Sequence, residues 1–221
     1  MAGVVKPPVR VILVTDGDKV ARRTLEYAAQ QLGLRCISAS AGNPTPLSGP
    51  ELVLLIQQAA HDPVLVMVDD KGYPGQGNGE RALEYLCRAP EVQVLGAVAV
   101  ASDTRHARGT PVDVSVTRDG KVVEHPVNKE GLPTPHKRFL IGDTVDVLRN
   151  LRLPVVVGMG DPGKMDGADC LERGCAVTLK AIQEVLKRSG WAEGASAAQG
   201  VPAPSAEGPA ACNPPPPEGT P

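Results

Sequence analysis

The hydrophobic positions of this chain form short continuous runs that alternate with segments of helical spacing. Five runs are rich in Val, Leu, Ile or Ala, namely residues 9–15, 35–38, 63–68, 92–101 and 154–157. Continuous apolar runs of this length are typical of strands that are buried on both faces of a sheet. We therefore expect five strands in the interior of the protein.

Between these runs, apolar residues recur every three or four positions, which predicts helices. Asp18 is a candidate N-cap for the first helix, Gly33 suits the position just after its end, and Pro50 suits the start of the second. Further helices are expected after a glycine-rich loop at residues 69–79, at 143–151 and at 178–189. The pair Asp119-Gly120 lies between runs 112–117 and 121–127, which predicts a β-hairpin.

Strands that alternate with helices predict an α/β fold with right-handed crossovers. We expect a three-layer, mainly parallel sheet, Rossmann-like or Toprim-like, with the hairpin as an insertion. Residues 1–190 are predicted to form a single domain. Residues 191–221 are predicted to be a disordered tail, because eight prolines, eight alanines and four glycines leave little apolar surface to offset the entropy of ordering.

Composition and charge exclude several classes of function. The formal net charge is −2 and aromatic residues make up 2% of the chain, so broad nucleic-acid binding and base stacking are not expected. There are five cysteines and no Cys-x-x-Cys pair, which favours buried thiols in a reducing compartment. The longest apolar run is too short to span a bilayer. We therefore expect a soluble protein of cytoplasmic type.

Acidic residues follow four of the expected strands. Asp16 and Asp18 follow the first and Asp69 and Asp70 the third, while Asp103 and Asp161 follow two others. Ligands of parallel sheets bind at the carboxyl ends of strands, and oxygen ligands of this kind suit Mg²⁺ or Ca²⁺. Asp16, Asp18, Asp69 and Asp70 are therefore candidate metal ligands. The simpler alternative is that these residues cap helices or close turns.

Two glycine-rich loops are candidates for binding an anion. Residues 158–164 match two phosphate-binding patterns weakly, since Met165 stands where a Walker motif needs Ser or Thr, and Pro162 lacks an N–H group. The loop at 71–80 either binds a ligand or is a mobile surface loop. The anion-binding candidates, which include a residue from a basic cluster, are Lys71, Gly75, Gly77, Arg105, Gly160, Gly163 and Lys164.

Several longer strings resemble one known family. They are RVILVTDGD, CISASAGNPTPLSGPELV, DPVLVMVDDKGYPGQGNGERALEYL, VLGAVAVASDT, DTVDVLRNLRLPVVVGMGDPGKMDGAD and AVTLKAIQEVLKRSG. Together they cover residues 9–190 almost completely and resemble stage V sporulation protein AE in its soluble form. The resemblance implies a protein of endospore-forming bacteria, encoded with the membrane proteins that move dipicolinic acid. It also implies association with the spore inner membrane and a part in germination, and it assigns no catalytic residues to this chain. Since the sequence shows neither a membrane span nor a basic amphipathic helix, we expect this association to come through protein partners.

A fainter likeness, at the level of the fold, links the chain to the Toprim nucleotidyl-transfer module. Asp16 stands where that module has Glu, and Asp69-Asp70 lacks its Asp-x-Asp spacing. Two hypotheses follow, the first from the family resemblance and the second from the acidic residues and the two glycine-rich loops. The first is a non-enzymatic accessory of the dipicolinate-handling membrane complex, which binds membrane proteins of its operon and takes calcium dipicolinate as a ligand. The second is an Mg²⁺-dependent or nucleotide-binding enzyme that acts on a phosphate substrate.

Overall fold

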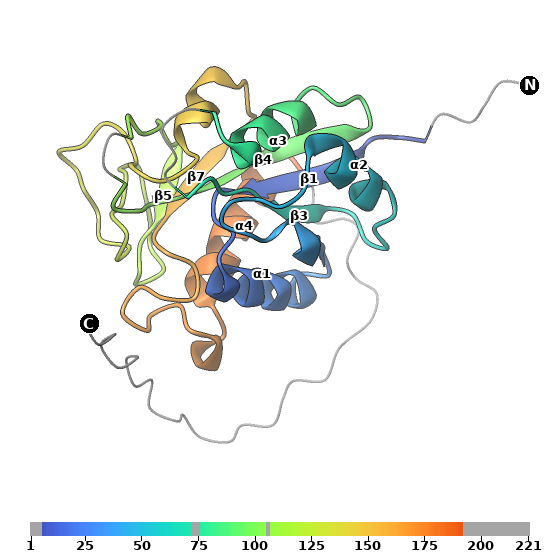
Figure 1. The fold of residues 1–221 in the computed structure, drawn as a ribbon. Coiled ribbons are helices and arrows are strands. Elements are labelled where there is room, and N and C mark those ends of the chain that lie inside the picture. Colours follow the sequence, from blue (N-terminus) through green and yellow to red (C-terminus); the bar gives the residue numbers. More distant parts are fainter. Residues whose placement is uncertain (1–5, 72–75, 105–106, 192–221) are drawn as a thin grey trace, which may run out of the picture.

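Seven strands form one sheet in the order β2-β3-β1-β4-β7-β5-β6 (Figure 1). The structure is a computed structural model that describes residues 6–71, 76–104 and 107–191. All neighbouring strands run parallel except β5 and β6. The strands are β1 (Val9–Val14), β2 (Arg35–Cys36), β3 (Val64–Met67), β4 (Val92–Val100), β5 (Val114–Val116), β6 (Val122–Val123) and β7 (Val156–Met159). The predicted α/β class and the hairpin are confirmed.

Helices cover both faces of the sheet and give it two apolar cores. The helices are α1 (Lys19–Gln31), α2 (Gly49–Gln57), α3 (Asn78–Leu86) and α4 (Ala176–Arg188). Strand residues alternate between the faces, as the pleat requires. Ile12 and Val14 pack in the core beneath α1 and α4, whereas Val11 and Leu13 pack in the core beneath α2 and α3. The result is the predicted three-layer arrangement.

Local signals in the sequence set the ends of the helices. The Asp18 carboxylate accepts the N–H groups of Val20 and Ala21, which caps α1 as predicted. Gly33 follows this helix with a φ of 67°, a conformation that favours glycine. At the start of α2, Ser48 and Glu51 form a capping box.

The structure corrects three predicted elements. Residues 143–151 form no α-helix but only the 3₁₀ turn η2 (Asp146–Asn150), because Thr144 has a φ of 57°, which an α-helix cannot include. The last parallel strand begins at Val156, two residues after the predicted start at Pro154. The second strand ends early because the chain turns into η1 (Ser38–Ser40). A third 3₁₀ turn, η3 (Leu171–Arg173), precedes α4.

The chain leaves β1 and β4 in opposite directions along the sheet. After β1 it passes through α1 to β2 on one side, and after β4 it continues to β5 and β7 on the other. Such a divergence opens a crevice between the carboxyl ends of the two strands, where parallel sheets bind their ligands. The fold thus makes this edge the natural place for a site.

The predicted disordered tail, residues 191–221, lies outside the described part of the chain except for Trp191, which packs against the core beneath α1 and α4. None of the helices in the described ranges combines the length and apolar character that a bilayer crossing demands.

Two leucines of α2 test the assignment of its buried face. Leu52 is fully buried and Leu54 is 58% exposed. We expect Leu52→Ala to lower the free energy of unfolding by about 2–5 kcal/mol, because it leaves a cavity in the core. Leu54→Ala is expected to change it by less than about 0.5 kcal/mol. Urea denaturation of both variants checks this, and equal losses would contradict the packing of this face.

Candidate functional site

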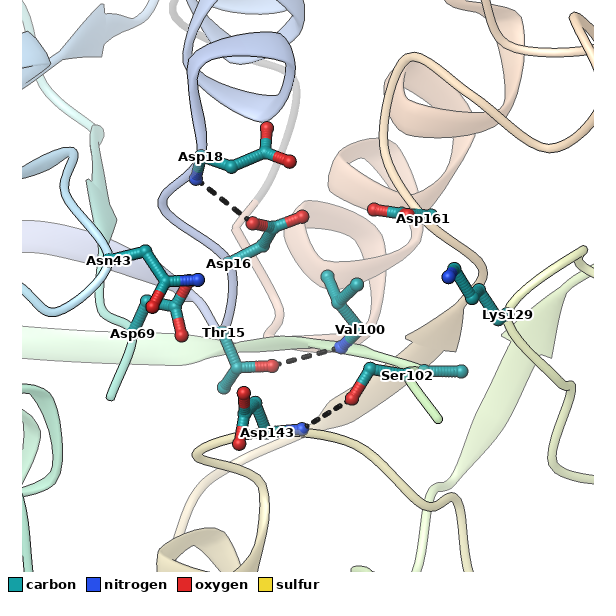
Figure 2. Close-up of a pocket in the computed structure, with 11 residues that line it drawn as sticks. Thr15, Asp16, Asp18, Asn43, Asp69, Val100, Ser102, Lys129, Asp143 and Asp161 are labelled. Atoms are coloured by element: carbon teal, nitrogen blue, oxygen red, sulfur yellow. Dashed lines mark hydrogen bonds between the residues drawn. The ribbon is translucent and has the colours of Figure 1, made fainter. Parts of the chain in front are cut away.

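A pocket of about 150 Å³ opens at the carboxyl ends of the central strands (Figure 2). Most of its lining residues are polar, and they come from the end of β4, from the segments that follow β1, β3, β4 and β7, and from loops that carry Asn43, Lys129 and Asp143. The lining residues are Thr15, Asp16, Asp18, Asn43, Asp69, Val100, Ala101, Ser102, Lys129, Asp143 and Asp161. Three of the four predicted metal ligands are therefore brought together at one pocket, which lies at the crevice between β1 and β4.

Residues at the end of β1 form the base of this pocket. The hydroxyl of Thr15 accepts the N–H of Val100 at 2.9 Å and so ties β1 to β4. The carboxylate of the buried Asp16 accepts the N–H of Asp18 at 3.1 Å. A Cβ on Gly17 would lie 2.5 Å from the carbonyl oxygen of Gly42, so only glycine fits between the two acids.

Asp18 serves two purposes. Its Oδ1 caps α1, accepting the Val20 and Ala21 N–H groups at 2.8 Å each. Its Oδ2 accepts a hydrogen bond of 2.6 Å from Nζ of Lys164. Asp18 can therefore cap α1 and belong to the candidate site at the same time, because each of these functions uses a different carboxylate oxygen.

Asp161, which follows β7, completes a cluster of three acids. One carboxylate oxygen from each of Asp16, Asp18 and Asp161 lies within 4.8 Å of the other two. The Lys164 ammonium contacts Asp161 at 3.1 Å as well as Asp18, so it bridges two of the three acids. Together the oxygens form a possible cation site that Lys164 partly neutralises.

The buried Asp169 holds the loop that carries Asp161 and Lys164. Its carboxylate accepts the Gly163 N–H at 2.9 Å. It also accepts the N–H groups of Val177 and Thr178 at the start of α4, each at 2.9 Å. The loop is thereby fixed to the N-terminus of α4 through one fully buried side chain.

Several backbone N–H groups of residues 158–164, which a phosphate-binding loop would offer to its ligand, form hydrogen bonds within the protein. Asp161 donates its N–H to the carbonyl of Lys129, and Lys164 donates to the carbonyl of Asp161. The N–H of Gly163 is taken by Asp169. A Cβ on Gly160 would lie 2.6 Å from the Lys129 carbonyl oxygen, so close packing explains this glycine. Phosphate binding by residues 158–164 therefore gains no support from the loop geometry.

Burial and like charges disturb the titration of the pocket acids. Burial raises the pKa of Asp16 to about 8, and the negative charge of Asp18 adds to the shift. Burial raises the pKa of Asp69 to about 6. Burial also opposes ionisation of Asp18, but hydrogen bonds, first among them that from Lys164, outweigh it and lower its pKa. The pocket thus gathers more negative charge than its own cations neutralise.

Asp69 and Asp70 have different surroundings although they are adjacent. Asp69 lines the pocket. Asp70 accepts the N–H groups of Gly79 and Glu80, each at 2.6 Å, and therefore caps α3. A Cβ on Gly77 would lie 2.1 Å from Oδ1 of Asp70, so this glycine makes room for the cap.

The remaining anion-binding candidates stay predictions. Lys71 has a φ of 57°, and its N–H donates to Asp69 at 3.2 Å. Gly75 and Arg105 lie outside the described residues.

Four polar pocket residues were not predicted from the sequence. They are Asn43, Ser102, Lys129 and Asp143. The Ser102 hydroxyl accepts the Asp143 N–H at 2.9 Å, which draws the segment before η2 to the rim of the pocket (Figure 2). Lys129 lies 3.7 Å from Asp103, the carboxylate that follows β4. Of these four residues, only Ser102 could have been predicted as a pocket residue, since it directly follows an expected strand.

The fold and pocket define a three-layer α/β protein with an acidic site at the carboxyl edge of a mainly parallel sheet. The profile of the stage V sporulation protein AE1 (SpoVAE) family matches residues 10–189. The chain belongs to this family and is thus a protein of the fifth stage of sporulation. No curated protein and no solved structure gives a significant match.

The substitution Asp16→Asn tests whether the buried Asp16 carboxyl, at the end of β1, destabilises the protein when it is ionised. The folded-state pKa of about 8 lies above the ordinary value of 3.8, so the folded protein binds this proton more tightly. The resulting stability is present below pH 3.8 and is lost as the pH rises through about 8. In EDTA at pH 8.5, Asp16→Asn is expected to be more stable than the wild type by roughly 1–3 kcal/mol.

Urea denaturation at pH 5 and pH 8.5 measures this effect. The advantage of Asp16→Asn should shrink at pH 5, where the wild-type carboxyl holds its proton. Glu91→Gln, at an exposed position just before β4 and thus at the opposite edge of the sheet, serves as the control. A variant less stable than the wild type at pH 8.5 would contradict the assignment.

Asp169→Asn tests the buried anchor of the loop. The amide replaces one accepting oxygen by a donor, so buried N–H groups lose their partner and the free energy of unfolding should fall by about 2–4 kcal/mol. Asp166→Asn removes a carboxylate whose side chain is 70% exposed, and it should cost less than about 1 kcal/mol. Urea denaturation compares the two, and a neutral effect of Asp169→Asn would refute the anchoring role.

Proposed function

We propose that this sporulation protein is a non-enzymatic accessory of the dipicolinate-handling membrane complex of the spore. In this proposal the acidic pocket binds a divalent cation, and the ligand is calcium presented as its dipicolinate chelate. Family membership supports the sporulation process. The expected partners are membrane proteins of the same operon, with the protein held peripherally at the spore inner membrane and assisting germination.

One observation carries the cation-binding part of the proposal. Carboxylate oxygens of Asp16, Asp18 and Asp161 lie within 4.8 Å of one another. They lie in the crevice between β1 and β4, where a parallel sheet binds ligands. Ca²⁺ favours several carboxylate and carbonyl oxygens in a flexible arrangement, and Asp69 lines the same pocket as a further candidate.

Lys164 supplies a cation of the chain's own to the same oxygens. Its ammonium contacts Asp18 at 2.6 Å and Asp161 at 3.1 Å. A divalent ion that binds these carboxylates must compete with this single positive charge. Removal of the lysine charge is therefore expected to strengthen cation binding.

The size and lining of the pocket favour a small charged ligand. A volume of about 150 Å³ is below the range of roughly 300–1,000 Å³ common for drug-sized ligands. Lys129, Asn43 and Ser102 line the same space and offer donors to ligand carboxylates. A compact dicarboxylate that carries a calcium ion matches both the acids and these donors.

The second hypothesis is an Mg²⁺-dependent enzyme acting on a phosphate substrate, since the same carboxylates suit Mg²⁺. Asp70, however, caps α3. The N–H groups of Gly163 and Lys164 are engaged within the protein. The pocket is also small for a nucleotide, so we rank this function second.

Calorimetric titration with CaCl₂, calcium dipicolinate, MgCl₂ and Mg-ATP tests the proposal. We expect the wild type to bind Ca²⁺ and to bind calcium dipicolinate more tightly than free Ca²⁺. Asp16→Asn should weaken both at least tenfold, which corresponds to about 1.4 kcal/mol. Lys164→Met should bind free Ca²⁺ more tightly, and Glu91→Gln should match the wild type.

Each outcome of the titration bears on a different part of the proposal. Equal heats for the wild type and Asp16→Asn would refute the site assignment. Binding of Ca²⁺ with no gain from dipicolinate would refute the chelate. Tight binding of Mg-ATP with weak binding of calcium dipicolinate would favour the enzyme.

A further inference from the structure

Two exposed arginines lie over the ring of Phe139, and two further exposed cations lie close to them in the sequence. The neighbouring Leu140 and Leu148 pack in the core beneath α2 and α3, so this surface lies on the face of the sheet away from α1 and α4. The guanidinium carbon of Arg149 lies 4.5 Å from the centre of the Phe139 ring, and that of Arg138 lies 5.6 Å from it. Lys137 precedes Arg138, and Arg152 follows η2 closely. We call this surface the Phe139 patch, and its members are Lys137, Arg138, Phe139, Arg149 and Arg152.

Among the residues that the structure describes, none of these four cations forms an ion pair with a carboxylate, unlike many other basic residues. Nine basic residues among those the structure describes form ion pairs with carboxylates. Within the same described ranges, no ion pair involves a cation of the Phe139 patch. All four cations are exposed. Their charges therefore add to a local positive field in a protein whose formal net charge is −2.

The two segments that carry the patch are fixed to each other. Thr110 pairs with Leu140, the residue after Phe139, through an isolated β-bridge. The Asp146 carboxylate at the start of η2 accepts the N–H of Arg108 at 2.9 Å and that of Gly109 at 2.6 Å. Both Phe139 and η2 are thus tied to residues 108–110. Arginines that lie over an aromatic ring keep the edges of their guanidinium groups available for phosphate oxygens.

We propose that the Phe139 patch binds the anionic phospholipid surface of a membrane. The cations lie on exposed segments and not in an enclosed cavity, which suits an extended anionic surface better than a single small anion. Each Lys or Arg close to an anionic bilayer adds to the affinity, and four together favour peripheral binding. The sequence did not predict this contact, because the cations come from two segments separated by residues 140–148.

Docking through the patch would hold the acidic pocket near the membrane. Phe139 and the pocket residue Asp143 are four residues apart, so their Cα atoms lie at most about 14 Å from each other. This inference rests on the proposed peripheral placement at the spore membrane, for which it names a direct lipid contact. It is independent of the proposed cation site, since it uses other residues and other ligands.

Co-sedimentation of the full chain with vesicles tests this surface. The vesicles are phosphatidylcholine alone or phosphatidylcholine with 30% phosphatidylglycerol, in 100 mM KCl and EDTA, so that no divalent cation contributes. We expect binding to the anionic vesicles only. Arg149→Gln with Arg152→Gln should weaken it roughly tenfold or more, because two cations that add to the affinity are removed.

A matched double variant shows whether vesicle binding depends on the Phe139 patch or only on the net charge of the protein. Arg22→Gln with Arg23→Gln removes the same charge from exposed positions on α1, on the opposite face of the sheet, and should bind like the wild type. Circular dichroism confirms that each variant is folded. Equal binding to neutral vesicles, an equal loss in both double variants, or tighter binding to duplex DNA than to anionic vesicles would each overturn the proposal.

Discussion

Repulsion among carboxylates at the carboxyl edge of the sheet is the constraint on which the site depends. Two carboxylates whose oxygens lie within 4.8 Å of each other repel by about 3 kcal/mol at an effective dielectric constant of about 20. The Lys164 ammonium relieves this for Asp18 and Asp161. Asp16 relieves it by retaining a proton, as its pKa of about 8 indicates. A divalent cation would contact all three carboxylates at once and offset two of their three negative charges.

The surrounding structure holds these three acids together despite their mutual repulsion. Gly17 lets the chain turn past Gly42 with no room for a side chain. Thr15 ties the end of β1 to β4, and the buried Asp169 joins the loop after β7 to the start of α4. Each of these contacts joins segments that are distant in the sequence or changes the direction of the chain. The pocket is therefore held in place by tertiary contacts of the fold.

The parts of this fold that depend on local signals could be predicted from the sequence. Continuous apolar runs located the strands, and Asp18 and Gly33 marked the two ends of α1. The predicted helix at residues 143–151 was wrong because Thr144 has a positive φ. A hydrophobic pattern carries no information about such a backbone conformation.

The edge of the sheet that carries the site could be predicted from the sequence, but the set of residues that forms the site could not. Strand ends gave the correct edge of the sheet, but Asp69 and Asp70 look equivalent in sequence, and only one of them lines the pocket. The contact of Lys164 with Asp18 joins residues 146 positions apart. Likewise, the arginines around Phe139 come from separate segments. Pairings of this kind follow from the tertiary structure and have no local pattern.

An anomalous difference map from crystals grown with CaCl₂ tests the central claim most directly. The account predicts a calcium peak about 2.3–2.6 Å from carboxylate oxygens of Asp16, Asp18 or Asp161, with the Lys164 ammonium withdrawn from them. A map with no peak in the pocket, in which Lys164 keeps its contacts with Asp18 and Asp161, would contradict it.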